Sequence, residues 1–196
     1  MEVQFKRSGT RRYGVTILRP GLTPFGKDPA PGYDELVPHD LMHFIVEREL
    51  GLKQGIFGQV AAGGTAGTFF PIDSDARNAR DAARRRRALA RRSEKLMLSG
   101  RRDTAASELA VYVVRNAWEA RRNRNSTRDQ AMGVNTILNS TLITREQLAW
   151  MCFELDALSA KWTALNIGEA ITLSWSEAKS TSRSNWEQRL KWTSSR

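Results

Sequence analysis

The stretch TREQLAWMCFELDALSAKWTALNIGEAITLSW, residues 144–175, contains the clearest helix pattern of the chain and a strand pattern directly after it. Thr144 and Gln147 match a capping box, in which each side chain satisfies a free backbone N–H at a helix start. Gly168 ends this helical region, and residues 170–175 are predicted as a strand. Apolar side chains recur along the helix at steps of three and four residues, which indicates one face on the core: Leu148, Met151, Cys152, Leu155, Leu158, Trp162 and Leu165.

The N-terminal residues carry the other strand signal. Residues 3–6 and 13–18 alternate apolar and polar side chains, and Gly9 lies in the turn between them, a pattern typical of a β-hairpin. Because strands are predicted at both ends of the chain with helices between them, we expect an α+β fold. The predicted sheet is small, three-stranded and antiparallel, formed by the N-terminal hairpin plus the C-terminal strand and covered by four to five helices.

The length of 196 residues predicts one domain with an appended segment. We expect a single globular domain over residues 1–175, with an exposed basic helix at 74–102. Residues 176–196 are expected to form either a polar C-terminal tail or a short docking helix. Residues 20–38 contain five of the six prolines and are predicted, like residues 63–73, to be a loop without regular structure.

A helix over residues 38–50 brings together the candidate site. Proline is tolerated at a first helical position, so Pro38 is a suitable start, and Gly51 is a suitable stop. The only two histidines of the chain, His39 and His43, lie here. At about 100° per residue they point about 40° apart, with Glu47 at about 80° from His39 and Asp40 at about 100°.

This spacing suits a metal centre. His39, His43 and Glu47 are the predicted metal ligands, and two histidines with one carboxylate is a set used for zinc and for non-haem iron. Asp40 is the candidate catalytic residue, either as a general base or as an acceptor that orients a histidine ring. The alternative is a purely structural cluster, in which Asp40 only complements the helix dipole.

The segment PHDLMHFIVERELG, residues 38–51, resembles a family of uncharacterised bacterial proteins that share a PHDLxHFxVExELG-like segment. The end of the chain is also similar to that family, in Leu165, Gly168, Ile171, Thr172, Leu173 and Trp175. The resemblance implies no activity. The HDxxH core is weakly similar to the metal-binding protein of ubiquinone biosynthesis, where a Glu follows after eleven further residues. This chain has Gly55 at that position.

The net charge of +10 favours anionic partners. Eleven Lys or Arg lie between Arg77 and Arg102, against only Asp81 and Glu94. This composition predicts either a nucleic-acid-binding surface, or a helix that is merely solvated or meets an acidic protein. The candidate nucleic-acid-binding residues are Arg77, Arg80, Arg84, Arg85, Arg86, Arg87, Arg91 and Arg92. In the next helix, Leu109, Tyr112, Val113, Asn116 and Ala117 are expected to share one face.

Several classes of protein are not expected. One cysteine excludes a disulfide framework within the chain. The sequence has no run of about 18 apolar residues and no apolar segment at its start, so we expect neither a transmembrane segment nor a secretory signal, and a cytoplasmic location. The one glycine-rich stretch, residues 63–68, lacks the lysine of a phosphate-binding loop, so no nucleotide cofactor is expected.

Three functions remain open at this point. The first is a metal-binding protein containing zinc or iron, with metal-dependent hydrolysis as the activity to be expected of it. The second is a nucleic-acid-binding accessory protein that uses the arginines of residues 77–102. The third is a non-catalytic interaction module whose basic helix contacts an acidic protein. The sequence predicts neither a substrate nor an oligomeric state.

Overall fold

The structure is a computed structural model that describes residues 1–72, 79–122 and 143–175. Within these ranges the chain forms an antiparallel sheet and five helices, so the predicted α+β class is confirmed. The strands are β1 (Glu2–Gly9), β2 (Arg12–Leu18), β3 (Phe25–Ala30), β4 (Phe70–Pro71) and β5 (Ala170–Ser174). The helices are α1 (His39–Leu50), α2 (Ile56–Ala61), α3 (Ala79–Ser99), α4 (Arg101–Arg122) and α6 (Arg145–Ala164).

The sheet is larger than predicted, because it has five strands in the order β4-β3-β2-β1-β5 rather than three. The predicted part is present: β1 pairs with β2 as a hairpin and with β5 on its other side. The additional strands lie in segments predicted as loops, with β3 inside residues 20–38 and β4 inside residues 63–73. They supply hydrogen-bond partners to a strand edge that a three-stranded sheet would leave open.

Pro29 explains why β3 is hard to recognise from sequence. Ala30 pairs with Tyr13 and Lys27 with Val15, and the register shifts between these two pairs. Pro29 therefore lies at an irregularity of the ladder, where a missing backbone N–H is tolerated. The irregularity also breaks the alternation of buried and exposed side chains that marks a regular strand.

Helix α1 is the centre of the fold. Eight consecutive residues, 40–47, are buried, so neighbouring elements surround the helix. Phe44 packs edge-on against Phe5 of β1 at 5.9 Å and against Phe57 of α2 at 5.2 Å between ring centroids. On other sides α1 contacts α4 and α6. The helix ends as predicted at Gly51, which adopts the left-handed conformation at φ 66°.

Helix α6 also follows the sequence pattern. Thr144 and Gln147 form the predicted capping box, with the Thr144 hydroxyl accepting from the Gln147 N–H at 3.2 Å. The Trp162 indole N–H donates to the Asp34 carbonyl at 3.2 Å, which attaches α6 to the loop before α1. Arg48 of α1 pairs with Glu154 of α6.

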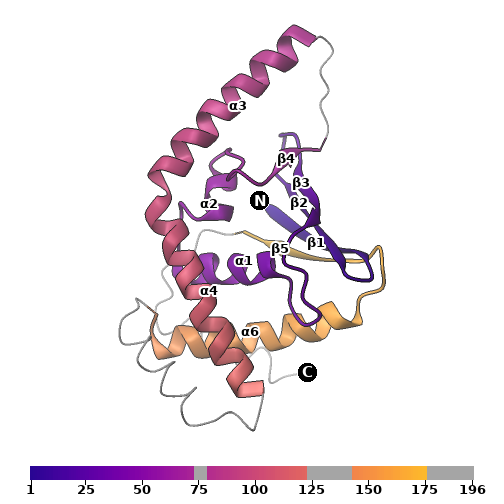
Figure 1. Cartoon of the computed structure of the whole chain (residues 1–196), viewed down its shortest axis with the longest axis vertical. Helices are drawn as coiled ribbons and strands as arrows, with labels where there is room; N and C mark the ends of the chain where they lie inside the picture. Colours follow the sequence, from indigo (N-terminus) through magenta and orange to yellow (C-terminus); the bar gives the residue numbers. More distant parts are fainter. Residues whose placement is uncertain (73–78, 123–142, 176–196) are drawn as a thin grey trace.

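The basic segment forms two helices, because Gly100 separates α3 from α4. Figure 1 shows them following one another along one side of the molecule, with the N-terminal half of α3 extending past the sheet. Among the described residues, no helix combines the length and apolar character needed to cross a membrane. Arg77 and the segment 176–196 lie outside the described residues.

Candidate metal centre

Three side chains that can ligate a metal meet where the start of α1 lies against α4. His39 and His43 project from the first two turns of α1, and their Nε2 atoms lie 3.1 Å apart. The ring centroids are 4.6 Å apart and the planes cross at 83°. Glu108 of α4 adds a carboxylate, whose Oε2 lies 3.7 Å from the His43 Nε2. Among the described residues, the ligand atoms of His39, His43 and Glu108 lie within 4.8 Å of one another.

A chain of buried hydrogen bonds fixes the tautomer of His43. The His43 Nδ1 lies 2.8 Å from the Ser107 hydroxyl, which donates to Glu47 Oε1 at 2.9 Å. A hydroxyl has one proton to donate, so when Ser107 donates it to the ionised Glu47 carboxylate, Ser107 accepts from the Nδ1–H of His43. The Nε2 of the neutral ring consequently carries a lone pair directed toward His39. Such an arrangement, in which the remote nitrogen is held by a protein acceptor, is characteristic of metal-ligating histidines.

Glu47 occupies a different position from the one predicted. Its carboxylate is fully buried and accepts the backbone N–H groups of Ile56 and Phe57, both at 2.8 Å, at the start of α2. A Cβ at Gly55 would come within 2.5 Å of the Glu47 carboxyl carbon, so only glycine fits there. Glu47 thus joins α1 to α2 and supports Ser107, while Glu108 supplies the carboxylate beside the two rings.

Asp40 likewise forms its hydrogen bonds with groups other than the two histidine rings. Its carboxylate accepts from Tyr13 Oη at 2.6 Å and from Lys27 Nζ at 2.8 Å, and it is nearly inaccessible to solvent. Burial, followed by the charge of Asp40, raises the pKa of Tyr13 far above its usual value. Asp40 therefore connects α1 to β2 and β3. Its negative charge acts to raise the pKa of His43, but burial and the neighbouring His39 outweigh it.

Electrostatics keep His43 neutral. Burial, and then the neighbouring His39, lower the pKa of His43 to about 4. The ring is consequently uncharged at neutral pH, which is the form that binds metals. Burial raises the pKa of Glu47 to about 7, against the opposing effect of its hydrogen bonds from Phe57 and Ile56.

The cluster lies at the edge of the core. The His43 side chain is only 1% exposed, His39 is half-buried, and the Glu108 side chain is 59% exposed. A metal held by these three groups would therefore have protein on the α1 side and solvent beyond Glu108. Three protein ligands with further positions open to water is the arrangement of catalytic rather than structural zinc sites.

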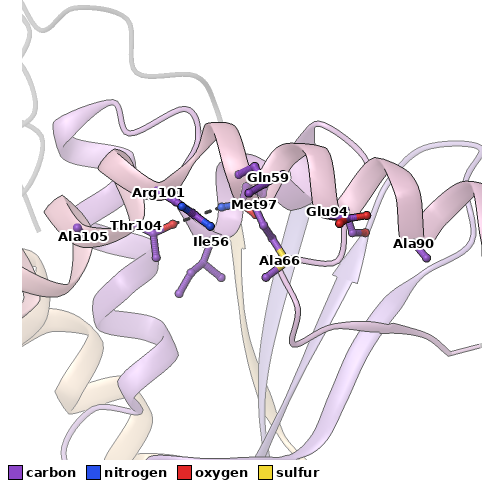
Figure 2. A pocket seen from close by; sticks show the side chains of 11 residues that line it. Ile56, Gln59, Ala66, Ala90, Glu94, Met97, Arg101, Thr104 and Ala105 are labelled. Atoms are coloured by element: carbon purple, nitrogen blue, oxygen red, sulfur yellow. Dashed lines mark hydrogen bonds between the residues drawn. The ribbon is translucent and has the colours of Figure 1, made fainter.

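A groove in the described part of the surface lies apart from this cluster. It measures about 620 Å³ and runs between α2 and the junction of α3 with α4 (Figure 2). None of the three candidate ligands lines it. The side chains along it are mostly apolar, with Glu94 and Arg101 as the charged members: Ile56, Gln59, Ala66, Ala90, Ser93, Glu94, Met97, Leu98, Arg101, Thr104 and Ala105.

The sequence spacing brought His39 and His43 together but missed Glu108 and Ser107. Leu109 and Tyr112, expected on one face of their helix with Val113, are both more than half exposed. The buried face of α4 is instead made by Ser107, Ala110, Val111, Val113, Val114 and Trp118. Ser107 lies at helical spacing from these apolar residues, and a polar residue at such a position was the one sequence signal that could have indicated its buried role. Glu108 lies on another helix, so no local spacing marks it.

Comparison of the chain with protein-family profiles, curated protein sequences and solved structures returned no match. The function is therefore argued from the residues of this site.

Proposed function

We propose that the protein binds a divalent transition metal, zinc or iron, through His39, His43 and Glu108. The observation that carries the proposal is the convergence of three ligand atoms within 4.8 Å. Two imidazoles and one carboxylate are the donor set of many catalytic zinc sites and of non-haem iron sites. Ser107 and Glu47 support the set by holding the Nδ1–H of His43.

The chemistry best suited to such a centre is activation of a bound water. A zinc ion with three protein ligands lowers the pKa of its water to about 7, which generates a nucleophile at neutral pH. The solvent-exposed side of the cluster, beyond Glu108, would admit both water and substrate. We therefore place metal-dependent hydrolysis first among the reactions to be assayed, and Asp40, held by Tyr13 and Lys27, is not part of the proposed chemistry.

Metal titration of the purified, chelator-treated chain tests the proposal. We expect one equivalent of Zn²⁺ or Co²⁺ to bind, and His43→Ala to abolish that binding. Glu108→Gln should weaken it, whereas Glu119→Gln should leave it unchanged. Glu119 is a matched control, because it lies on the same helix and its side chain is 56% exposed against 59% for Glu108.

Two results would contradict the proposal. One is the absence of stoichiometric binding by the folded wild-type chain. The other is binding that survives His43→Ala. If Glu47→Gln rather than Glu108→Gln changed the absorption spectrum of bound Co²⁺, the carboxylate ligand of the site would be Glu47, as the helical spacing predicts.

A further inference from the structure

Helix α3 carries a continuous basic stripe on its outer face. The stripe residues follow one another at steps of four, three, four and four, so at 100° per residue they fall within a sector of about 80°. All of them are exposed. They are Arg80, Arg84, Arg87, Arg91 and Lys95, and the name α3 stripe is used for this set.

The opposite face of α3 attaches the helix to the domain. Ser93 is buried, and its hydroxyl oxygen accepts a hydrogen bond from the Thr65 backbone N–H at 3.0 Å. Leu89 is half-buried against the core. Leu89 is the central residue of α3 and Ser93 belongs to its C-terminal half. The N-terminal half extends past the sheet (Figure 1), so its cations are presented to the surroundings on more than one side.

The charge of α3 is high for its length. Its 21 residues contain eight Lys or Arg against Asp81 and Glu94, so this one helix carries more than half of the net charge of +10. Arg84, Arg85, Arg86 and Arg87 are consecutive and point in four directions around the axis, and all four are exposed. A helix with cations on several sides fits a partner that surrounds it with negative charge.

We propose that α3 is a binding surface for double-stranded DNA, which it engages by lying in the major groove with the α3 stripe and the flanking arginines on the phosphates. An α-helix with its side chains is about 10–12 Å across, and the major groove of B-form DNA is about 12 Å wide. In the groove a phosphate strand runs along each side of the helix, which accounts for cations that point in several directions. Arginine suits this role because its fork donates two parallel hydrogen bonds to a phosphate.

Other anionic partners fit α3 less well. An anionic membrane requires a broad apolar face opposite the charges. The face of α3 opposite the stripe carries Ala82 between Arg85 and Arg86 in its N-terminal half, and further along it Leu89 and Ser93 pack on the domain. Double-stranded RNA has a deep, narrow major groove that does not admit a helix. An acidic protein would meet the stripe on one side only, leaving Arg85 and Arg86 without a role.

Fluorescence anisotropy with a labelled DNA duplex of generic sequence and the full chain tests the proposal. Binding through the five stripe cations and the flanking Arg85 and Arg86, about seven phosphate contacts, should weaken about a thousandfold to ten-thousandfold between about 50 and 200 mM salt. The test variant is Arg84→Gln, Arg87→Gln, Arg91→Gln and Lys95→Gln combined. Glutamine keeps helix propensity close to that of arginine and lysine. This variant should lose most of the affinity and reduce the slope of log K against log salt by about 3 to 4.

A second variant separates the stripe from overall charge. The second variant combines Lys6→Gln, Arg11→Gln, Arg145→Gln and Lys161→Gln. It removes the same number of positive charges, four, from exposed positions outside α3. It should keep the affinity within about threefold, because contributions of distant charges are screened over about 10 Å at this salt concentration. Unchanged circular dichroism of both variants provides the folding control.

Comparing the affinity for DNA with the affinity for other polyanions identifies the class of partner. We expect the DNA duplex to bind tighter than an RNA duplex of the same sequence, polyglutamate or vesicles containing phosphatidylserine. The proposal is overturned if wild type does not bind DNA at about 50 mM salt, where phosphate contacts are strongest. It is also overturned if both variants lose affinity equally, or if RNA, polyglutamate or vesicles bind more tightly than DNA.

Discussion

Ser107 of α4 donates its hydroxyl proton to Glu47 of α1 across 2.9 Å, inside the core. The bond connects two functions of the fold. Glu47 caps the start of α2 through the Ile56 and Phe57 N–H groups, and Ser107 holds the Nδ1–H of His43. The packing of three helices and the orientation of one candidate ligand therefore depend on the same hydrogen-bond chain.

The first prediction concerns Ser107. Ser107→Ala removes the acceptor for the His43 Nδ1–H and leaves that ring free to change tautomer. We expect a tenfold to hundredfold loss of Zn²⁺ affinity, the usual effect of removing a group that orients a ligand, and a loss of about 1–3 kcal/mol in the free energy of unfolding. Isothermal titration and urea denaturation measure the two effects.

Ser93→Ala is the matched control, because Ser93 is also a buried, hydrogen-bonded serine on a helix. It should lower stability and leave the Zn²⁺ affinity of His39, His43 and Glu108 unchanged. Equal effects of the two substitutions on metal affinity would argue against a role for Ser107 in orienting His43.

The second prediction follows from two opposed pKa shifts. The pKa of Glu47 is raised from 4.5 to about 7, because the folded state favours its protonated carboxyl. The resulting contribution to stability is complete below pH 4.5 and is lost as pH rises to 7. The pKa of His43 is lowered from 6.5 to about 4, so its contribution is present above pH 6.5 and is lost as pH falls to 4. Each shift corresponds to about 3 kcal/mol, and in the window where both act the slopes cancel.

We therefore expect each single substitution to expose the slope of the other group in metal-free protein. His43→Gln should make the free energy of unfolding fall, relative to wild type, as pH rises from 4.5 to 7. Glu47→Gln should make it fall as pH decreases from 6.5 to 4. Urea denaturation at half-unit pH steps measures both profiles, and parallel profiles for wild type and the two variants would contradict the opposed shifts.

His43 and Glu47, the two groups of this pH prediction, belong to a part of the site that the sequence predicts only incompletely. The spacing of His39 and His43 on a capped, apolar-striped helix fixes their relation, because four residues make about one turn. The same reasoning gave Glu47 a direction 80° away without saying which element lies there, and that element is α2. Glu108 and Ser107 enter the site through the packing of α4 on α1, which joins residues 60 or more positions apart and leaves no local pattern.

The sheet shows the same division. The hairpin and β5 carry period-two alternation or a clear apolar run, and both were predictable. Strand β3 pairs with β2 across the proline at position 29, where composition indicates a loop. Strand β4 has two residues, too few for any periodicity. Each pairs with the open edge of the strand beside it, β3 with β2 and β4 with β3, and that edge rather than their own side-chain pattern places them in the sheet.

The third prediction distinguishes a structural from a catalytic Asp40. Lys27 and Asp40 form an ion pair at 2.8 Å with side chains 10% and 6% exposed. Asp40→Asn leaves the Lys27 ammonium buried without its counter-charge, which should cost about 3–5 kcal/mol of stability. The double substitution Asp40→Asn with Lys27→Met should recover much of that loss, because both charges are then gone.

Metal binding by folded Asp40→Asn protein should be unchanged, since Asp40 bonds to Tyr13 and Lys27 rather than to the two rings. Urea denaturation and Zn²⁺ titration of the two variants provide the measurements. A small stability change in Asp40→Asn, together with a large loss of metal affinity, would show that Asp40 takes part in metal binding.

The fourth prediction uses the metal as a stabilising ligand. A ligand that binds only the folded state raises the free energy of unfolding by RT ln(1 + [L]/Kd), about 2.7 kcal/mol at a hundred times Kd. Zn²⁺ at that excess should therefore raise the melting temperature of wild type and of Glu119→Gln to a similar extent. Glu108→Gln should show a smaller shift, because a neutral amide replaces the carboxylate, and His39→Ala should show almost none, because alanine offers no ligand atom in place of the imidazole. A Zn²⁺-dependent shift of equal size in all four proteins would place the metal at a site that His39 and Glu108 do not form.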